Sequence, residues 1–193
     1  MQTDHYCQTR IKPDITPADN EIEANEQLLA NLCKRIASLT TAQYTWRYKN
    51  SASSIGKHIR HIIDHYTCFF RTLAESYVDY NNRTRGSVLE TSVDAASGIL
   101  NEIVHQLSDL RHLPARQISA GQISVYISID PDERAAPVES NLKRELLFLQ
   151  SHTLHHMAVI QLLLDLLGSP VEPDFAYAPS TKKFLKKNGS RYE

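Results

Sequence analysis

Residues 138–167 constrain the fold of this chain more than any other stretch. Their apolar side chains recur every three or four residues, which is the spacing of one helix face. Pro137 suits the beginning of such a helix and Gly168 its end. The inward stripe comprises Leu142, Leu146, Leu149, His152, His156, Ile160, Leu163 and Leu167. Two histidines therefore stand in a core stripe where aliphatic residues would be expected.

Three earlier segments carry the same helical periodicity. They cover residues 19–39, 54–76 and 93–110. Four helices with mostly short connections are typical of a helical bundle. We therefore predict an all-α four-helix bundle over residues 1–168, followed by a C-terminal tail over residues 169–193 that packs on the bundle or extends from it.

The remaining segments lack the helical period. Residues 122–129 alternate polar and apolar side chains, which is a strand pattern. This pattern predicts a short β-hairpin insertion before the last core helix, with its partner strand around residues 116–118. We expect loops at residues 44–53 and 77–85.

Composition argues against several kinds of partner. The formal net charge is −1, so the chain lacks the basic field that nucleic acids and acidic membranes attract. No apolar run reaches the roughly 18 residues that cross a bilayer. The three cysteines are widely spaced and form no Cys-x-x-Cys pair, which is typical of reduced thiols. We predict a cytoplasmic protein with no nucleic-acid and no membrane partner.

Histidines provide the main functional signal. His152 and His156 are four residues apart, so their imidazoles share one helix face and could hold one metal ion. Two buried histidines bonded to carbonyl groups or water are an equally good interpretation of the spacing alone. In the helix at residues 54–76, His58, His61 and His65 all line one flank. On these grounds any of the three could be a third ligand.

Two motifs carry a family resemblance. Ser54-Ile-Gly-Lys-His-Ile-Arg-His-Ile-Ile-Asp-His-Tyr66 and, far downstream, Ser151-His-Thr-Leu-His-His156 resemble the DinB/YfiT superfamily of metalloenzyme-like proteins. The resemblance implies His61, His152 and His156 as ligands of a divalent metal, with His65, His58 and His155 as alternates. It also implies an up-down-down-up order of the four helices and a homodimer.

Three neutral imidazoles leave at least one coordination position of a divalent ion open. An ion of this kind lowers the pKa of bound water to about 7 and deprotonates a bound thiol. The resemblance slightly favours S-transfer with a low-molecular-weight thiol and a small-molecule substrate over metal-dependent hydrolysis. A non-catalytic metal-binding module would have its fourth position closed by His65, His155 or Asp64. Zinc, nickel and iron all accept imidazole, so the ligands do not identify the metal.

Four further side chains are candidates with competing structural interpretations. Asp64 could accept a hydrogen bond from a ligand histidine or act as a base, but a solvated helix acid is slightly favoured. Cys68 could be a reactive thiol, although buried apolar packing is favoured for a free cysteine. Arg83 and Arg85 could bind an anionic group of a cofactor or substrate, and are more often simply solvated.

Overall fold

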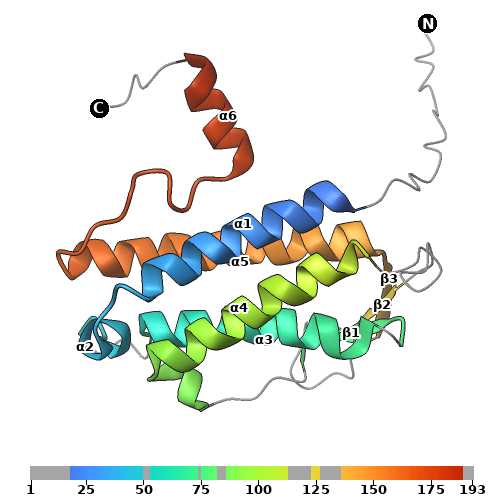
Figure 1. The fold of residues 1–193 in the computed structure, drawn as a ribbon, viewed down its shortest axis with the longest axis horizontal. Helices are drawn as coiled ribbons and strands as arrows, with labels where there is room; N and C mark the ends of the chain where they lie inside the picture. Colours follow the sequence, from blue (N-terminus) through green and yellow to red (C-terminus); the bar gives the residue numbers. More distant parts are fainter. Residues whose placement is uncertain are drawn as a thin grey trace, which may run out of the picture.

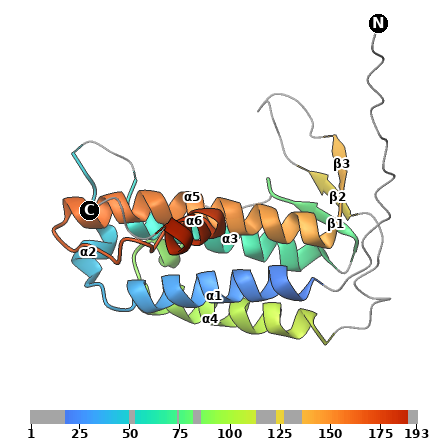
Figure 2. The same ribbon diagram turned by 90° about the horizontal axis from the view of Figure 1, so that it is seen from above.

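Four long helices form a bundle in the computed structural model, which describes residues 18–49, 53–73, 75–81, 86–112, 123–126 and 136–188. They are α1 (Asp19–Ile36), α3 (Ile55–Leu73), α4 (Val93–Leu110) and α5 (Leu142–Leu166). Helix α1 packs against α4 and α5, and α3 packs against the same two helices, so the four surround one core (Figures 1 and 2). The predicted helical bundle is confirmed, while the up-down-down-up order stays a prediction.

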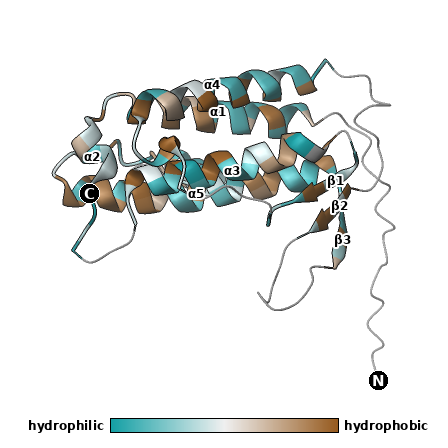
Figure 3. Ribbon diagram, turned by 90° about the horizontal axis from the view of Figure 1, so that it is seen from below, coloured by the Kyte–Doolittle hydropathy of each residue, from teal (hydrophilic) through white to brown (hydrophobic). Residues whose placement is uncertain are grey.

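Apolar side chains that recur along one face of each helix build the core. Polar and apolar residues alternate along the long helices (Figure 3), as expected for helices with one buried face. Among the described helices, none combines the length and the apolar character needed to cross a bilayer. The fully buried residues of the bundle include Leu29, Leu32, Ile36, Ile59, Ile62, Tyr66, Phe69, Leu100 and Leu107.

The buried stripe of α5 is displaced from the predicted one. Thr153 and Met157, exposed by 1% and 0%, occupy the centre of the stripe between Leu149 and Ile160. His152 and His156 are only half-buried and lie at its edge. The buried Thr153 is polar, but its hydroxyl donates a hydrogen bond to the Tyr66 hydroxyl at 3.4 Å. This bond lowers the cost of burying a polar side chain in the core.

Another buried polar group joins three helices. The hydroxyl of Tyr66 on α3 donates to Oδ1 of Asn25 on α1 at 2.5 Å. The amide of Asn25 donates in turn to the main-chain oxygen of Leu146 on α5 at 3.0 Å. Asn25 is fully buried, so removing the Tyr66 hydroxyl would take away the hydrogen bond that satisfies its Oδ1 atom.

A small sheet covers one end of the bundle. Strand β2 (Ile123–Tyr126) pairs in parallel with β1 (Tyr77–Asp79) and antiparallel with β3 (Pro137–Ser140). In the register, Val125 lies opposite Val78 on one side and Val138 on the other. The predicted insertion is therefore part of a three-stranded sheet.

Several predicted boundaries are wrong. Residues 137–140 form β3, so α5 begins later than predicted, where the Asn141 side chain accepts a hydrogen bond from the Arg144 N–H at 3.0 Å. This is a helix N-cap that the sequence interpretation overlooked. The partner strand predicted around residues 116–118 lies outside the described residues.

Short elements replace parts of the predicted loops. Helix α2 (Thr41–Thr45) begins with a capping box between Thr40 and Gln43, and β1 occupies the first part of the loop predicted at residues 77–85. A 3-10 turn, η1 (Val88–Glu90), precedes α4.

The C-terminal tail contains a helix that periodicity did not predict, α6 (Pro179–Asn188). Before α6, the chain is attached to α1 because Nη2 of Arg35 donates to the main-chain oxygen of Ser169 at 2.6 Å. Phe175 also packs against the core. The division into a domain of residues 1–168 and a tail stays a prediction.

Gly56 permits a close contact at the beginning of α3. A Cβ atom at this position would lie 2.1 Å from the main-chain oxygen of Glu90 and 2.7 Å from the ring of Tyr44. The Tyr44 hydroxyl in turn donates to the main-chain oxygen of Leu89 at 2.8 Å. Only glycine therefore lets α3, α2 and η1 meet at this point.

We expect Gly56→Ala to lower the free energy of unfolding by about 1–3 kcal/mol, the usual cost of overpacking. Urea denaturation measures the change. Gly98→Ala is the matched control, because a Cβ at this site in α4 meets nothing within 4 Å. Alanine there should stabilise the helix by about 0.5–1 kcal/mol. Equal stability of the two variants would contradict the close-contact explanation.

Candidate metal centre

Three histidines meet where α3 packs against α5. His61 lies on α3, and His152 and His156 lie one turn apart on α5. One ring nitrogen from each can be chosen so that all three nitrogens lie within 4.8 Å of one another. The ring centroids are 4.9 Å apart for His61 and His152, and 4.6 Å apart for both other pairs. The arrangement brings together side chains that are about 90 residues apart in the sequence.

The donor set suits a divalent transition metal. Two nitrogens of a tetrahedral zinc site lie about 3.4 Å apart when each Zn–N distance is about 2.1 Å. The ligand nitrogens of the three histidines lie within 4.8 Å of one another, which is compatible with a shared ion. Imidazole is a ligand that zinc, nickel and iron accept. The residues present therefore fit the kind of ion that the sequence predicted.

The surroundings of His156 favour its neutral form. Burial, followed by the charges of His152, His58 and His155, lowers the pKa of His156 to about 3. A histidine must be neutral to bind a metal, because the ligand nitrogen has to be free of a proton. Near neutral pH, His156 therefore needs to release no proton before it can act as a ligand.

His58 contacts the ring of His156 and falls outside the three-histidine group. Its Nδ1 lies 2.9 Å from Nδ1 of His156, and its Nε2 lies 2.5 Å from Oγ of Ser53. Burial, followed by the charge of His155, lowers the pKa of His58. His58, an alternate ligand in the sequence analysis, thus contacts one member of the group.

The other two alternates also have different environments. His65 is 5% exposed, and its Nδ1 donates to the main-chain oxygen of His61 at 2.9 Å. Its ring lies 4.0 Å from the ring of His152 and stacks on Tyr80. His155 is exposed, with its ring centroid 5.1 Å from that of His156.

Comparisons with known proteins agree with this geometry. A family model of the DinB superfamily matches residues 24–160. The chain belongs to the DinB superfamily. The matched segment contains all three histidines of the candidate centre, as well as His58 and His65.

One solved structure shows the same fold. YfiT from Bacillus subtilis, described as a probable metal-dependent hydrolase with an unusual four-helix bundle topology, is similar over 78% of this chain and 87% of its own. The TM-score is 0.57 and the sequence identity is 20%. No curated protein sequence matched the chain.

Aromatic side chains form a wall beside the histidines of this DinB protein. Phe148 stacks on His152, with ring centroids 5.7 Å apart, and Tyr80 lies 5.1 Å from Phe148. The Tyr80 hydroxyl donates to Oε2 of Glu145 at 2.8 Å. Burial, followed by the charge of Glu145, raises the pKa of Tyr80. Tyr80 therefore stays protonated and continues to donate to Glu145.

Glu145 is a buried acid that was not among the candidates of the sequence analysis. It is fully buried and also accepts hydrogen bonds from the Ser140 hydroxyl and from Nη1 of Arg144, the latter at 2.8 Å. The spacing of Glu145 could have indicated its burial. Four buried residues recur every four positions on one face of α5: Glu145, Leu149, Thr153 and Met157. Glu145 joins α5 to Tyr80 after β1 and to β3.

Of the remaining candidates, Asp64 and Cys68 are described, and neither belongs to the three-histidine group. Asp64 forms an ion pair with Arg60, whose Nε lies 2.8 Å from Oε1 of Glu90. The side chain of Asp64 is 12% exposed, so it is a half-buried ion-pair partner and not the solvated acid that was favoured. Cys68 is buried, 2% exposed, in line with packing. Arg83 and Arg85 lie outside the described residues.

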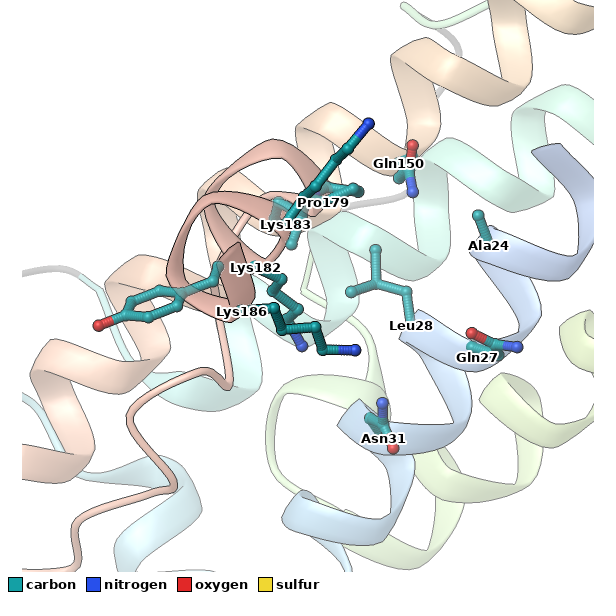
Figure 4. A pocket seen from close by; sticks show the side chains of 11 residues that line it. Ala24, Gln27, Leu28, Asn31, Gln150, Pro179, Lys182, Lys183 and Lys186 are labelled. Carbon is teal, nitrogen blue, oxygen red and sulfur yellow. The ribbon is translucent and has the colours of Figure 1, made fainter. Parts of the chain in front are cut away.

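A separate groove of about 510 Å³ lies between α1, α5 and the tail (Figure 4). No histidine or acid is among the described residues that line it, so it lacks the chemistry of the candidate centre. Its lining comprises Ala24, Gln27, Leu28, Asn31, Gln150, Leu154, Tyr177, Pro179, Lys182, Lys183 and Lys186.

We expect the protein to bind one zinc ion per chain, and His61→Ala, His152→Ala and His156→Ala each to lose most of it. Elemental analysis of protein purified without an affinity tag and dialysed against zinc measures this. His105→Ala is the control, because His105 is an exposed histidine of α4. Equal zinc content in all four variants would contradict the assignment.

The metal-free protein should lose stability as the pH falls from about 6.5 towards about 3. In this window the unfolded state binds a proton at His156, whose usual pKa is 6.5, and the folded state does not. Acid therefore favours unfolding. Thermal melting at a series of pH values measures the effect in the wild type and in His156→Gln. The difference between them isolates His156 from the carboxylates, and identical pH profiles would contradict the lowered pKa.

Proposed function

We propose that this DinB protein is a divalent-metal-dependent hydrolase in which His61, His152 and His156 hold the metal. The observation that carries the proposal is the meeting of these three imidazoles, with ligand nitrogens within 4.8 Å of one another. Three neutral nitrogen ligands leave a position open where a divalent ion lowers the pKa of water to about 7 and polarises a substrate carbonyl.

The chain's own residues contribute position and environment. Burial keeps His156 neutral at physiological pH. Phe148 and the buried Tyr80 form an apolar wall beside His152. An apolar wall lowers the local dielectric constant and strengthens electrostatic interactions within the site.

The grouping of the ligand atoms supports an open site. Among the described residues, the group whose ligand atoms lie within 4.8 Å of one another comprises His61, His152 and His156 and leaves out His65, His155 and Asp64. Three protein ligands with a vacant fourth position are typical of a catalytic zinc site, whereas a structural site has four.

Hydrolysis is favoured over the S-transfer that the sequence resemblance slightly preferred. The similar structure, YfiT, is described as a probable metal-dependent hydrolase, although an identity of 20% supports the fold and not the substrate. No described residue points to a thiol cofactor, so S-transfer is an alternative outcome of the same assay.

The experiment loads the stripped protein separately with zinc, nickel and iron and supplies two panels of substrates. One panel holds chromogenic esters and amides, and the other pairs low-molecular-weight thiols with an electrophile. We expect metal-dependent hydrolysis that chelator abolishes, that His61→Ala loses and that His105→Ala retains. Thiol consumption without hydrolysis would overturn the proposal in favour of S-transfer. Bound metal without turnover in either panel would support a non-catalytic module.

The homodimer implied by the family resemblance is a separate proposal. Sedimentation equilibrium of the full chain tests it, and a single monomeric species across the micromolar range would rule it out.

A further inference from the structure

The Nδ1 atoms of His58 and His156 face each other. They are 2.9 Å apart, within hydrogen-bond distance, and the ring centroids are 5.1 Å apart. His58 lies on α3, three residues before His61 and nearly one turn away. It therefore reaches His156 from the helix that also supplies His61.

Only one proton can lie between these two nitrogens when both rings are neutral. A neutral imidazole carries a proton on one ring nitrogen and a lone pair on the other. If Nδ1 of His156 carries the proton, it donates to His58, and Nε2 of His156 keeps its lone pair. If Nδ1 of His58 carries the proton, Nε2 of His156 is protonated and cannot bind a metal.

We propose that His58 is a positioning residue that holds His156 in its Nδ1–H form and so makes Nε2 of His156 available to the metal. This inference rests on the proposed metal function. Histidine ligands in proteins usually donate their second N–H to an acceptor that fixes the tautomer and the ring orientation. Carboxylates and main-chain carbonyls are the usual acceptors, whereas in this chain the acceptor is a second imidazole.

Ser53 completes the arrangement. When His58 accepts at Nδ1, its own proton lies on Nε2, which is 2.5 Å from Oγ of Ser53. The Nε2–H group of His58 then donates to the Ser53 hydroxyl oxygen. The proton positions along Ser53, His58 and His156 are thereby linked. The arrangement in which Nδ1 of His156 carries the proton leaves the lone pair of its Nε2 atom for the metal.

Asp64, which the sequence analysis considered as an acceptor for a ligand histidine and slightly favoured as a solvated acid, pairs with Arg60, which also contacts Glu90. His58 adds a contact to His156 that the sequence analysis did not consider. The sequence had considered His58 only as an alternate ligand.

The test compares His58→Asn with His58→Leu. The Oδ1 atom of asparagine can occupy nearly the same place as Nδ1 of histidine and accept a hydrogen bond, whereas leucine cannot. Zinc affinity is measured by competition with a chromophoric chelator. We expect His58→Leu to bind zinc about 10–100-fold more weakly, the usual effect of removing such an acceptor. His58→Asn should stay within a few-fold of the wild type.

His155→Leu is the matched control. The ring of His155 also lies 5.1 Å from that of His156, but the side chain is exposed. Its removal should leave the zinc affinity unchanged. Ser53→Ala should weaken binding less than His58→Leu, because it removes only the second bond of the arrangement.

A second measurement reads the proton directly in the metal-free proteins. Long-range ¹H–¹⁵N NMR distinguishes the two neutral forms of His156. We expect the Nδ1–H form in the wild type and in His58→Asn, and a shift to the Nε2–H form in His58→Leu. The inference is overturned if His156 has the same form in all three proteins, or if His58→Leu binds zinc as tightly as the wild type.

The two measurements separate this inference from the proposed function. A wild-type protein that binds no zinc, but whose His156 form depends on residue 58, would refute the metal function and leave the positioning role of His58 standing. A protein that binds zinc and hydrolyses esters, but whose His156 is protonated at Nε2, would support the metal function and refute the positioning role of His58.

Discussion

The packing of α3 against α5 is the contact on which the candidate centre depends. Thr153 and Met157 occupy the middle of the buried face of α5, so His152 and His156 come to lie at its edge, facing α3. A polar residue at the middle of the face is tolerated because Thr153 bonds to Tyr66, which bonds to Asn25 of α1. Buried polar groups with satisfied hydrogen bonds favour one arrangement of helices over its neighbours. The half-buried position of the histidines follows from this arrangement.

A concentration of imidazoles in one place has electrostatic consequences. His58, His61, His65, His152 and His156 contact one another in a continuous series of ring pairs between α3 and α5. Protonation of any ring disfavours protonation of the next, because like charges repel and the site is only partly solvated. Burial and neighbouring imidazoles lower the pKa of His58 and His156, which therefore stay neutral where isolated histidines would begin to charge. At His156 a divalent cation would bind a nitrogen lone pair without competition from a bound proton.

The apolar periodicity of single segments predicted the long helices. The features that were not predicted depend on contacts between residues far apart in the sequence. The periodicities of α1, α3 and α4 are properties of single segments, and the predicted and observed spans agree closely. The beginning of α5 was misplaced because Pro137 suits the first turn of a helix, whereas the pairing of Val138 with Val125 places this segment in a strand. For the site, helical spacing paired His152 with His156, and the family resemblance selected His61 among three histidines on one flank. Nothing in the local sequence revealed that His58 faces His156 or that Glu145 bonds to Tyr80, because each contact depends on a partner more than 60 residues away.

The small sheet links the two helices that carry the histidines. Strand β1 follows α3 and strand β3 precedes α5, and both pair with β2. Main-chain hydrogen bonds of the sheet thus resist sliding of α3 along α5. The sheet thereby keeps the imidazoles of α3 opposite those of α5. Zinc, nickel and iron all accept imidazole, so the ion bound there would depend on the geometry that each prefers and on its availability in the cell.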